Sequence, residues 1–493
     1  MKAASAIVIG AGIGGLATAA HLAQRGLHVT VIEKNPRPGG RCDYFERDGH
    51  QFNTGPTLLI MPHIYETEFA ALGTSLRERL DLLRVDPTYH VIFDDGSQLS
   101  LTSDMKQMYA QLEAIEPNSF NGYLRYLEEG CRHYNVGIER LAKHDFRTAF
   151  DFFSPRNLPL LFQLNPLAGH YSHMSAFFGN PRLKSAFTFQ DAYMGLSPFE
   201  APATFSMMPY AELAHGVWYP RGGMTQVVQA LVDIAKEAGV DFEFEANVQR
   251  IEIVDNRARG ILLEDGRRLT ADIVIANADL PYVYQSLLPD HAEAEKLAHK
   301  RYSCSTISFF WGVDKPYPQL PPHALFLADD YRENFEAIDR LSLADNPSLY
   351  IHTPSRIDPD SAPTGEDTLV AIVPVGHLDD MHEQDWRCIR DQARESVFKR
   401  LKLLGITDLK KHIKFEVDYT PLSWRKRYNL LKGATHGLSH TLTQLAYLRP
   451  HNRHARYHNL YFVGASTHPG TGVPTALIGA HHVADRVMDD LRS

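Results

Sequence analysis

The sequence predicts an α/β fold that begins with a Rossmann-like dinucleotide-binding domain, and three observations support this. Residues 6–9 form an apolar, β-branched run that is typical of a buried parallel strand. Residues 10–15 follow with G-x-G-x-x-G spacing, and residues 16–25 then have the composition of a helix. A second strand over residues 28–32 ends in the acidic Glu33. Strand, glycines, helix, strand and acid come in the order that a dinucleotide-binding unit requires.

Each part of this unit has a physical role. Gly10 permits the tight turn, Gly12 lets the backbone approach a pyrophosphate, and Gly15 lets the helix pack closely on the strand. The helix N-terminus offers free N–H groups and the positive end of a dipole to the phosphates. Glu33 lies where a carboxylate accepts hydrogen bonds from an adenosine ribose. We therefore expect an adenine dinucleotide at this end of the chain.

The bulk composition narrows the class of protein. A length of 493 residues predicts two or three modules, and 44% hydrophobic with 22% charged residues is typical of a soluble globular protein. A net charge of −9 without a block of like charge gives no reason to expect nucleic-acid binding. The four cysteines have no CxxC spacing, which predicts no zinc site and fits a reduced, cytoplasmic compartment. No run of about 18 apolar residues is present, so a membrane-spanning helix is not expected.

The first half of the chain beyond the dinucleotide unit alternates between hairpin and helix. Residues 91–100 predict a hairpin that turns at residues 94–97, and residues 103–136 have a helical pattern. Residues 146–171 are rich in Phe and Leu but contain three prolines, which exclude one long helix. This apolar segment either dips into a bilayer interface or forms an internal helical subdomain.

The second half predicts further strands. Residues 240–253 and 272–276 have strand patterns and could rejoin the first sheet, which would make the dinucleotide domain discontinuous. Residues 305–313 and 368–375 fit an antiparallel sheet with an apolar, cavity-facing side. A long amphipathic helix is expected over roughly residues 383–404.

The chain ends in a second strand, glycine turn and helix. Residues 459–465 predict the strand, residues 466–474 the glycine- and proline-rich turn, and residues 475–491 the helix. The N-terminus of this helix can face a second anionic or polar group. His481 and His482 fall within the helix, and we expect them on its solvated face rather than as a ligand pair.

Two stretches carry a family resemblance. Residues 33–41, which end in Gly39-Gly40-Arg41, resemble the extended N-terminal signature of the flavin amine oxidase superfamily. Residues 464–474 resemble the C-terminal signature of the bacterial and fungal carotenoid desaturases of the phytoene desaturase type. Other motifs similar to that family are residues 193–198, 218–223, 354–359 and 448–450, so the resemblance covers essentially the whole chain.

The resemblance implies a fold and a division of the chain. It implies an amine-oxidase-type FAD-binding domain formed by residues 1–90, 216–300 and 440–493. An α+β substrate domain built on an antiparallel sheet is expected from residues 91–135 and 301–439, and a helical, membrane-associating subdomain from residues 136–215.

The resemblance also implies a reaction. The redox cofactor would be FAD, and the substrate a linear carotenoid or isoprenoid hydrocarbon taken from a membrane surface to which the cytoplasmic protein attaches peripherally. A hydrocarbon offers no charge to grip, so its binding must come from burial in a long apolar tunnel. The expected chemistry is hydride transfer from an allylic carbon to the flavin N5, with proton loss from the neighbouring carbon. A quinone or oxygen would reoxidise the flavin.

The expected site residues follow from the motifs and from the resemblance. No metal ligands are expected. His468, in the C-terminal turn, is the candidate for shaping the site or accepting a proton, and Arg147 and Asp151 are candidates at the tunnel mouth. The expected cofactor-binding residues are Gly10, Gly12, Ile13, Gly14, Gly15, Glu33, Lys34, Gly40, Arg41, Gly55, Pro56, Thr57, Val248, Gly464, Ala465, Gly472, Val473 and Pro474.

Three alternatives stay open at this point. Carotenoid isomerases and terminal-methyl oxygenases carry the same motifs as the desaturases. A flavin amine oxidase or a protoporphyrinogen-oxidase-like enzyme would share the fold but act on a polar or macrocyclic substrate. A flavoprotein fold retained only to bind carotenoid would bind FAD without turnover.

Overall fold

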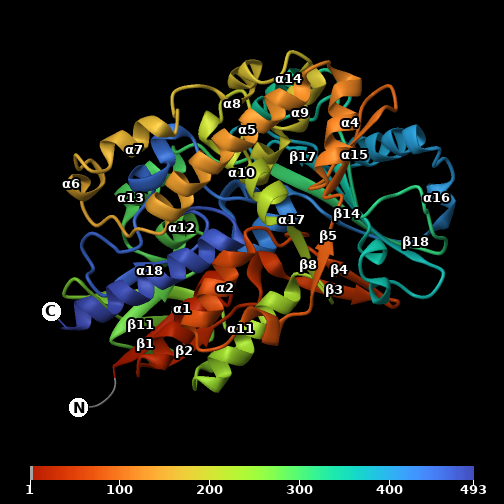
Figure 1. Ribbon diagram of the computed structural model, residues 1–493. Helices are drawn as coiled ribbons and strands as arrows, with labels where there is room; N and C mark the ends of the chain where they lie inside the picture. Colours follow the sequence, from red (N-terminus) through yellow and green to blue (C-terminus); the bar gives the residue numbers. More distant parts are fainter. Residues whose placement is uncertain (1–3, 493) are drawn as a thin grey trace.

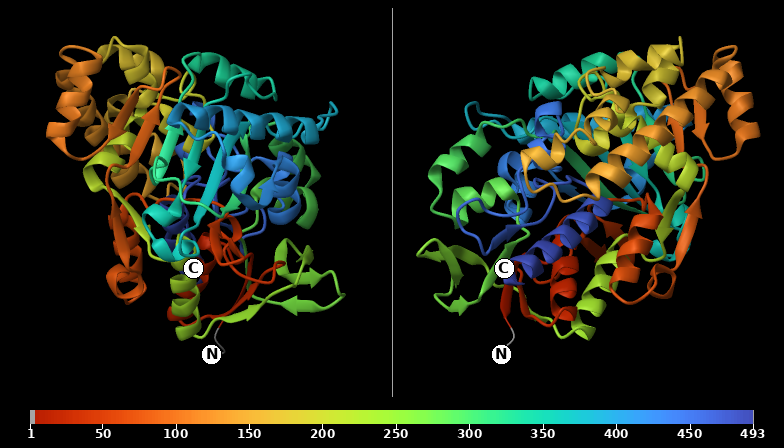
Figure 2. Two further views of the ribbon diagram at one scale, coloured as in Figure 1. Left: turned by 90° about the vertical axis from the view of Figure 1, so that its right-hand side faces the viewer. Right: turned by 60° about the vertical axis from the view of Figure 1, so that its left-hand side comes forward.

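The computed structural model describes residues 4–492 and is organised around two sheets (Figure 1). A five-stranded parallel sheet has the order β19-β13-β1-β2-β9, and a seven-stranded sheet has the order β18-β14-β17-β16-β15-β6-β7. The parallel sheet lies at the end of the molecule that carries both termini, and the larger sheet lies at the other end (Figures 1 and 2). An α/β fold with two sheets agrees with the prediction from the sequence.

The parallel sheet brings together strands from three distant parts of the chain. At its centre Val8 pairs with Val31 on one side and with Ile275 on the other. All the side chains of 273–276 and 460–462 are buried, because helices or strands cover both faces of this sheet. The expected return of later strands to the first sheet is confirmed for residues 241–243 and 273–276, whereas residues 248–254 pair in a separate sheet. The domain boundaries stay a prediction. The strands are β1 (Ser5–Ile9), β2 (His28–Ile32), β9 (Asp241–Glu243), β13 (Ile273–Ala276) and β19 (Leu460–Phe462).

Helices cover one face of the parallel sheet and a small sheet covers the other. The helices α1 (Ile13–Gln24), α11 (Thr225–Glu237) and α18 (Val473–Arg492) share one apolar core with strands β1 and β2. The opposite face packs on a three-stranded antiparallel sheet, which stands out beside the N-terminus (green strands in Figure 2). Its strands are β10 (Val248–Val254), β11 (Arg257–Leu263) and β12 (Arg268–Thr270).

The seven-stranded sheet is antiparallel except for one pair. The expected pairing of 305–313 with 368–375 is confirmed, in register from Ser305 opposite Val375 to Val313 opposite Asp367. Strands β15 and β6 are parallel, an arrangement that requires a long connection between the two strands, as is present here. The helix α15 (Trp386–Leu401) packs on one face, within the expected range. The strands are β6 (Tyr89–Ile92), β7 (Gln98–Leu101), β14 (Ser305–Val313), β15 (His323–Phe326), β16 (Leu349–His352), β17 (Asp367–Val375) and β18 (Ile413–Tyr419).

Two predicted elements are each divided in the structure. The helical stretch 103–136 forms α4 (Met105–Ile115) and α5 (Ser119–Tyr134), because Pro117 cannot continue a helix and Asn118 adopts a left-handed backbone. The predicted strand 240–253 divides into β9 and β10, since Glu245 has φ of 56° and turns the chain. Both breaks depend on single residues inside otherwise regular patterns.

The remaining elements are short. The proline-rich segment forms α6 (Ala149–Phe152), α7 (Leu158–Gln163) and α8 (His170–His173), as its prolines predict. Two-stranded sheets pair β3 (Tyr44–Arg47) with β4 (His50–Asn53) and β5 (Leu82–Val85) with β8 (Val217–Pro220). The other helices are α2 (Pro62–Ala71), α3 (Leu76–Arg79), α9 (Pro181–Ala186), α10 (Met207–Tyr210), α12 (Leu280–Tyr282), α13 (His291–Ala298), α14 (Tyr331–Asp339), α16 (Leu409–His412) and α17 (Pro421–Tyr428). No helix within residues 4–492 is long and apolar enough to span a bilayer.

Candidate active site

The glycine turn after β1 leaves no room for side chains. Gly10 has φ of 100°, and a Cβ on Gly15 would lie 2.2 Å from the carbonyl oxygen of Gly10. A Cβ on Gly12 would lie 2.7 Å from Oδ1 of Asn277, which follows β13. No side chain caps the N-terminus of α1, so its first N–H groups are available to a ligand.

Glu33 holds the turn from the end of β2. Its Oε2 accepts a hydrogen bond from the Ala11 backbone N–H at 2.8 Å, and its Oε1 accepts from the backbone and side chain of Asn35. The side chain is buried, yet Oε2 accepts only one of these hydrogen bonds and can accept another. Glu33 therefore fixes the glycine turn and retains acceptor capacity for a ribose hydroxyl.

The predicted Gly-Gly-Arg segment closes over the same turn. The Gly39 N–H donates to the carbonyl of Ala11, which places this segment against the glycine turn. A Cβ on Gly55 would lie 1.8 Å from the Arg41 carbonyl oxygen, so only glycine fits at that crossing. The Arg41 guanidinium donates to the Thr435 carbonyl at 2.9 Å. Burial lowers the pKa of Arg41, and the nearby Asp279 carboxylate opposes that effect.

The C-terminal turn meets the N-terminal one. The side chain of Asn277 donates to the Val463 carbonyl at 2.9 Å, which ties the end of β13 to the end of β19. The chain then passes through Gly464 and Gly472, both with positive φ, into α18. The starts of α1 and α18 therefore line one cavity, although 460 residues separate Ile13 from Val473 in the sequence.

This cavity has a volume of about 560 Å³ and collects nearly all of the residues expected to bind the cofactor. Gly15 is the exception, because it packs α1 against β1 and faces away from the cavity lining. Direct contact with a cofactor stays a prediction for each of them. The expected residues that line the cavity are Gly10, Gly12, Ile13, Gly14, Glu33, Lys34, Gly40, Arg41, Gly55, Pro56, Thr57, Val248, Gly464, Ala465, Gly472, Val473 and Pro474.

The cavity continues between the seven-stranded sheet and the helical segment, where its walls become apolar. Few polar groups interrupt this part, chiefly the hydroxyls of Tyr89, Tyr193 and Tyr350. The apolar lining comes from Ile138, Phe189, Met194, Met207, Met208, Leu325, Leu327, Phe335, Ile338, Leu349 and Ile372. One end of the cavity thus suits a dinucleotide and the other suits a hydrocarbon.

The residues at the dinucleotide end fit FAD. Glycines form a cradle that any Cβ would fill, an uncapped helix N-terminus faces the cavity, and a buried carboxylate has acceptor capacity left. Arg41 supplies a planar cation that suits a diphosphate. Val248, the first residue of β10, lines the same cavity.

The three candidate catalytic residues lie outside the lining of this cavity. His468 is buried, its Nε2 faces the His144 carbonyl at 3.2 Å, and burial beside His482 lowers its pKa to about 3. His468 thus contacts the backbone and not the cavity, and a catalytic role for it stays a prediction. Arg147 is exposed and pairs with Asp489 at 2.7 Å, and Asp151 faces His144 at 3.5 Å. The structure does not bring Arg147 and Asp151 to the cavity, and a catalytic role for them stays a prediction.

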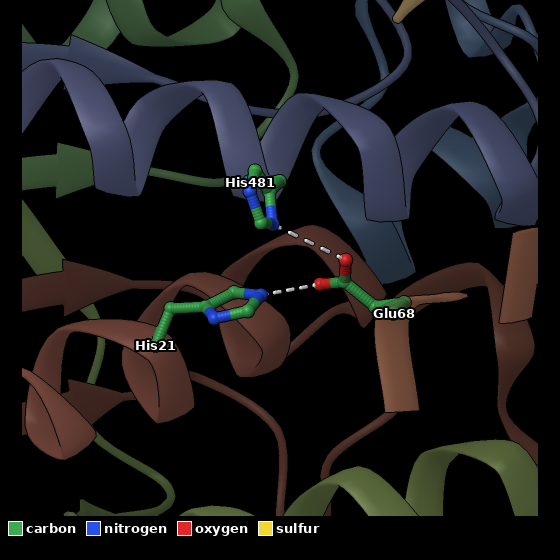
Figure 3. Close-up of side chains that lie close together, drawn as sticks. All are labelled: His21, Glu68 and His481. Atoms are coloured by element: carbon green, nitrogen blue, oxygen red, sulfur yellow. Dashed lines mark hydrogen bonds and ion pairs between the residues drawn. The ribbon is translucent and has the colours of Figure 1, made fainter. Parts of the chain in front are cut away.

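The expected position on a solvated face is wrong for His482, which is buried, whereas the His481 side chain is 38% exposed. His481 also faces Glu68 of α2 with its Nδ1 at 3.7 Å (Figure 3). His21 of α1 contacts the other oxygen of Glu68 at 2.6 Å. His482 is buried because its ring stacks on that of His468, with the ring centroids 5.7 Å apart.

Several cavity residues had no place in the sequence interpretation. Asn277 and Asp279 follow β13, and Thr435 and His436 come from a loop before the C-terminal turn. Polar residues at the end of the predicted strand 272–276 were a usable signal, because ligands bind at the carboxyl ends of parallel strands. The loop at 435–436 has no such pattern, and only the folded chain brings it to the cavity.

Comparison with known proteins identifies the family to which this chain is similar. A family model described as "Flavin containing amine oxidoreductase" matches residues 13–488. A phytoene desaturase of Fusarium fujikuroi is 42% identical over 99% of this chain and 89% of its own length. A zeta-carotene-forming phytoene desaturase of Myxococcus xanthus is 40% identical over 98% of this chain and 93% of its own length.

Solved structures show the same fold at low sequence identity. A putrescine oxidase has a TM-score of 0.67 at 16% identity, with 99% of each chain covered. An oxidoreductase from Methanosarcina mazei has a TM-score of 0.66 at 17% identity and covers 98% of this chain and 100% of its own. At such identities the similarity concerns the fold alone.

Proposed function

The chain belongs to the phytoene desaturase family of flavin-containing amine oxidoreductases, and from this premise we propose that it desaturates a linear carotenoid precursor with FAD as its redox cofactor. The main observation in support of this proposal is that one continuous cavity has glycine turns suited to a dinucleotide at one end and apolar walls at the other. Bound FAD supplies an oxidant that accepts two electrons, which is the chemistry that formation of a carbon–carbon double bond requires.

The residues of the chain contribute binding, orientation and exclusion of water. The glycine turns and Arg41 hold the dinucleotide, and the two helix N-termini orient its ends. The apolar lining binds the hydrocarbon by burial and keeps water away from the reacting carbons. Desaturation is favoured over amine oxidation, because the walls at the far end of the cavity are mostly apolar. A cationic amine would lose its hydration there without gaining polar partners.

A membrane surface is proposed as the source of the substrate. Three of the four most exposed large apolar side chains among the described residues lie on and beside α6 and α7, where Phe150 is 91%, Phe162 83% and Leu167 87% exposed. These helices lie at one edge of the molecule, away from both sheets (Figure 1). We call the five residues Phe150, Phe153, Leu158, Phe162 and Leu167 the apolar patch. Exposed apolar side chains of this size, clustered in one segment, are typical of an interaction surface, and a bilayer interface fits them.

The proposed function is tested with purified protein, FAD and phytoene in liposomes. Under anaerobic conditions we expect the flavin absorbance to bleach, and chromatography should show more conjugated products. Bleaching by a panel of amines without any response to phytoene would overturn the proposal in favour of an amine oxidase. Geometric isomers or oxygenated products in place of new double bonds would point to an isomerase or a terminal oxygenase. Addition of a quinone or oxygen after bleaching tests the two proposed electron acceptors.

A further inference from the structure

A chain of hydrogen bonds leaves the apolar part of the cavity at Tyr350 in β16. The hydroxyl of Tyr350 is hydrogen-bonded to the hydroxyl of Thr57 at 2.8 Å, and Thr57 lies among the residues expected near the flavin. The same hydroxyl contacts Nδ1 of His323 in β15 at 2.6 Å. Tyr350 and Thr57 line the cavity, whereas His323 lies behind them and is buried.

The chain of hydrogen bonds ends at two stacked histidines, and each has a ring nitrogen without a hydrogen-bond partner. The rings of His323 and His352 lie 4.7 Å apart and differ by 5° in orientation. His352 directs its Nδ1 to the Pro322 carbonyl at 3.0 Å, and the Nε2 atoms of both histidines are buried without a hydrogen-bond partner. Burial lowers the pKa of His352 to about 4 and that of His323 well below its usual value. Both rings are therefore neutral at neutral pH, and each has a nitrogen that can accept a proton.

The desaturation requires such an acceptor. Removal of hydride from an allylic carbon leaves a cationic centre, and the neighbouring C–H group then becomes strongly acidic. A weak neutral base is sufficient for such a proton, provided that it lies next to the substrate in an otherwise dry cavity.

A second hydroxyl pair in the cavity is less suitable. Tyr89 and Tyr193 contact each other, and Glu212 lies behind Tyr193. Burial raises the pKa of Glu212 to about 8, so its carboxyl group holds its own proton at neutral pH. A protonated carboxyl group is a poor proton acceptor compared with a neutral imidazole, which leaves the Tyr350 chain as the better candidate.

We propose that the Tyr350 hydroxyl accepts the proton released from the substrate and passes its own proton to Nδ1 of His323. The C–H bond breaks, its electron pair becomes the second bond of the new double bond, and the two electrons of the hydride go to FAD. The oxygen of Tyr350 gains one proton and loses one, and the positive charge moves from the substrate to the imidazole of His323. This inference rests on the proposed function.

The test compares Tyr350→Phe and His323→Gln with the control Tyr123→Phe. Tyr123 is a buried tyrosine that neither lines the cavity nor takes part in the hydrogen-bond chain. In anaerobic single turnovers we expect the first double bond to form about 10²-fold more slowly in both variants, as for loss of a general base. The control should stay within about threefold of the wild type, because it removes a buried hydroxyl that lies outside both the cavity lining and the hydrogen-bond chain.

Two further measurements separate proton transfer from a merely structural role. Deuterium at the carbon that loses the proton should give a larger isotope effect in Tyr350→Phe than in the wild type, since proton loss then limits the rate. In ¹⁵N-histidine spectra, Nδ1 of His323 should be unprotonated in the wild type, and its signal should shift in Tyr350→Phe. FAD affinity and melting temperature, measured for each variant, show whether it is folded.

The outcomes distinguish the inference from the function on which it rests. An inactive wild type would overturn the proposed function. An active wild type with both variants near its rate, or a proton on Nδ1 of His323, would overturn the relay alone. A slow Tyr350→Phe variant without a larger isotope effect would also overturn it, because altered packing would explain the loss. If one variant does not fold, the other decides by the same criteria.

Discussion

Glu33 and Glu212 show how the surroundings of one residue type decide its role. Glu33 accepts hydrogen bonds from three N–H groups, which fix the glycine turn. Glu212 has one amide donor, from Gln190 at 3.0 Å, and its Oε1 has no partner. Burial with so little compensation raises the pKa of Glu212 to about 8. The first carboxyl group suits cofactor binding and the second is held neutral beside an apolar cavity.

The raised pKa of Glu212 predicts a pH dependence of stability. Below its unfolded pKa the group is protonated in both states, and above it only the folded protein holds the proton. The stability that this proton contributes is therefore lost as the pH rises towards about 8, and it changes no further above that value. The Glu212→Gln variant has no such proton. The melting temperature of the variant minus that of the wild type should therefore be about 2–4 °C higher at pH 8.5 than at pH 5.5.

The difference between the two proteins is the readout, since all other groups titrate equally in both. Melting curves at half-unit pH steps measure it. A difference that stays constant across this range would contradict the assignment of a raised pKa to Glu212.

At the scale of elements, α1, α2 and α18 are joined by the cluster of His21, Glu68 and His481 (Figure 3). Each helix contributes one side chain, and His21 and Glu68 are buried. His21 and His481 each lie eight residues after the first residue of their helix, α1 at Ile13 and α18 at Val473. The cluster therefore fixes the relative height of α1 and α18, the two helices whose N-termini line the cavity.

We expect Glu68→Ala to destabilise the protein by about 2–3 kcal/mol, because it removes the ion-pair partner of the buried His21 inside the interface. Equilibrium unfolding in urea measures this loss. The matched control is Glu66→Ala, on the exposed side of the same helix, for which a change below about 0.5 kcal/mol is expected. Equal losses for the two variants would show that the cluster contributes nothing.

At the scale of the whole molecule, the apolar patch and part of the cavity lining come from adjoining parts of the helical segment. Ile138 and Met207 of this segment line the cavity, and the apolar patch lies on the short helices between them in sequence. Attachment through that patch would hold the cavity near the lipid that carries the hydrocarbon. The buried cluster beneath it, which includes Phe146 and Phe152, anchors these short helices to the body of the protein.

The combined variant Phe150→Ser, Phe162→Ser and Leu167→Ser tests this attachment. These three side chains contribute little to the folded core because they are more than four-fifths exposed. We expect the fraction bound in liposome flotation to fall about tenfold or more, with FAD binding unchanged. A control with Met381→Ser and Val254→Ser removes exposed apolar side chains outside the patch and should float like the wild type. Undiminished flotation of the triple variant would exclude the patch as the membrane contact.

The sequence by itself determined the elements whose causes are local. Glycines determine the turn at residues 10–15, because they allow backbone conformations and close contacts that other residues cannot adopt. The β-branched runs on either side determine the strands. The same local logic predicted the turn at 464–474 and the breaks in the proline-rich segment. Nearly all of the expected cofactor residues line one cavity for this reason.

Only the tertiary structure decided which distant residues meet. His482 was expected on a solvated face, because no pattern in α18 indicates that the C-terminal turn with His468 covers it. Tyr350 and His323 lie on neighbouring strands, and the pairing register of β15 with β16 brings their side chains together and towards Thr57. Such contacts depend on long-range packing and strand register, which a local pattern of residues does not encode.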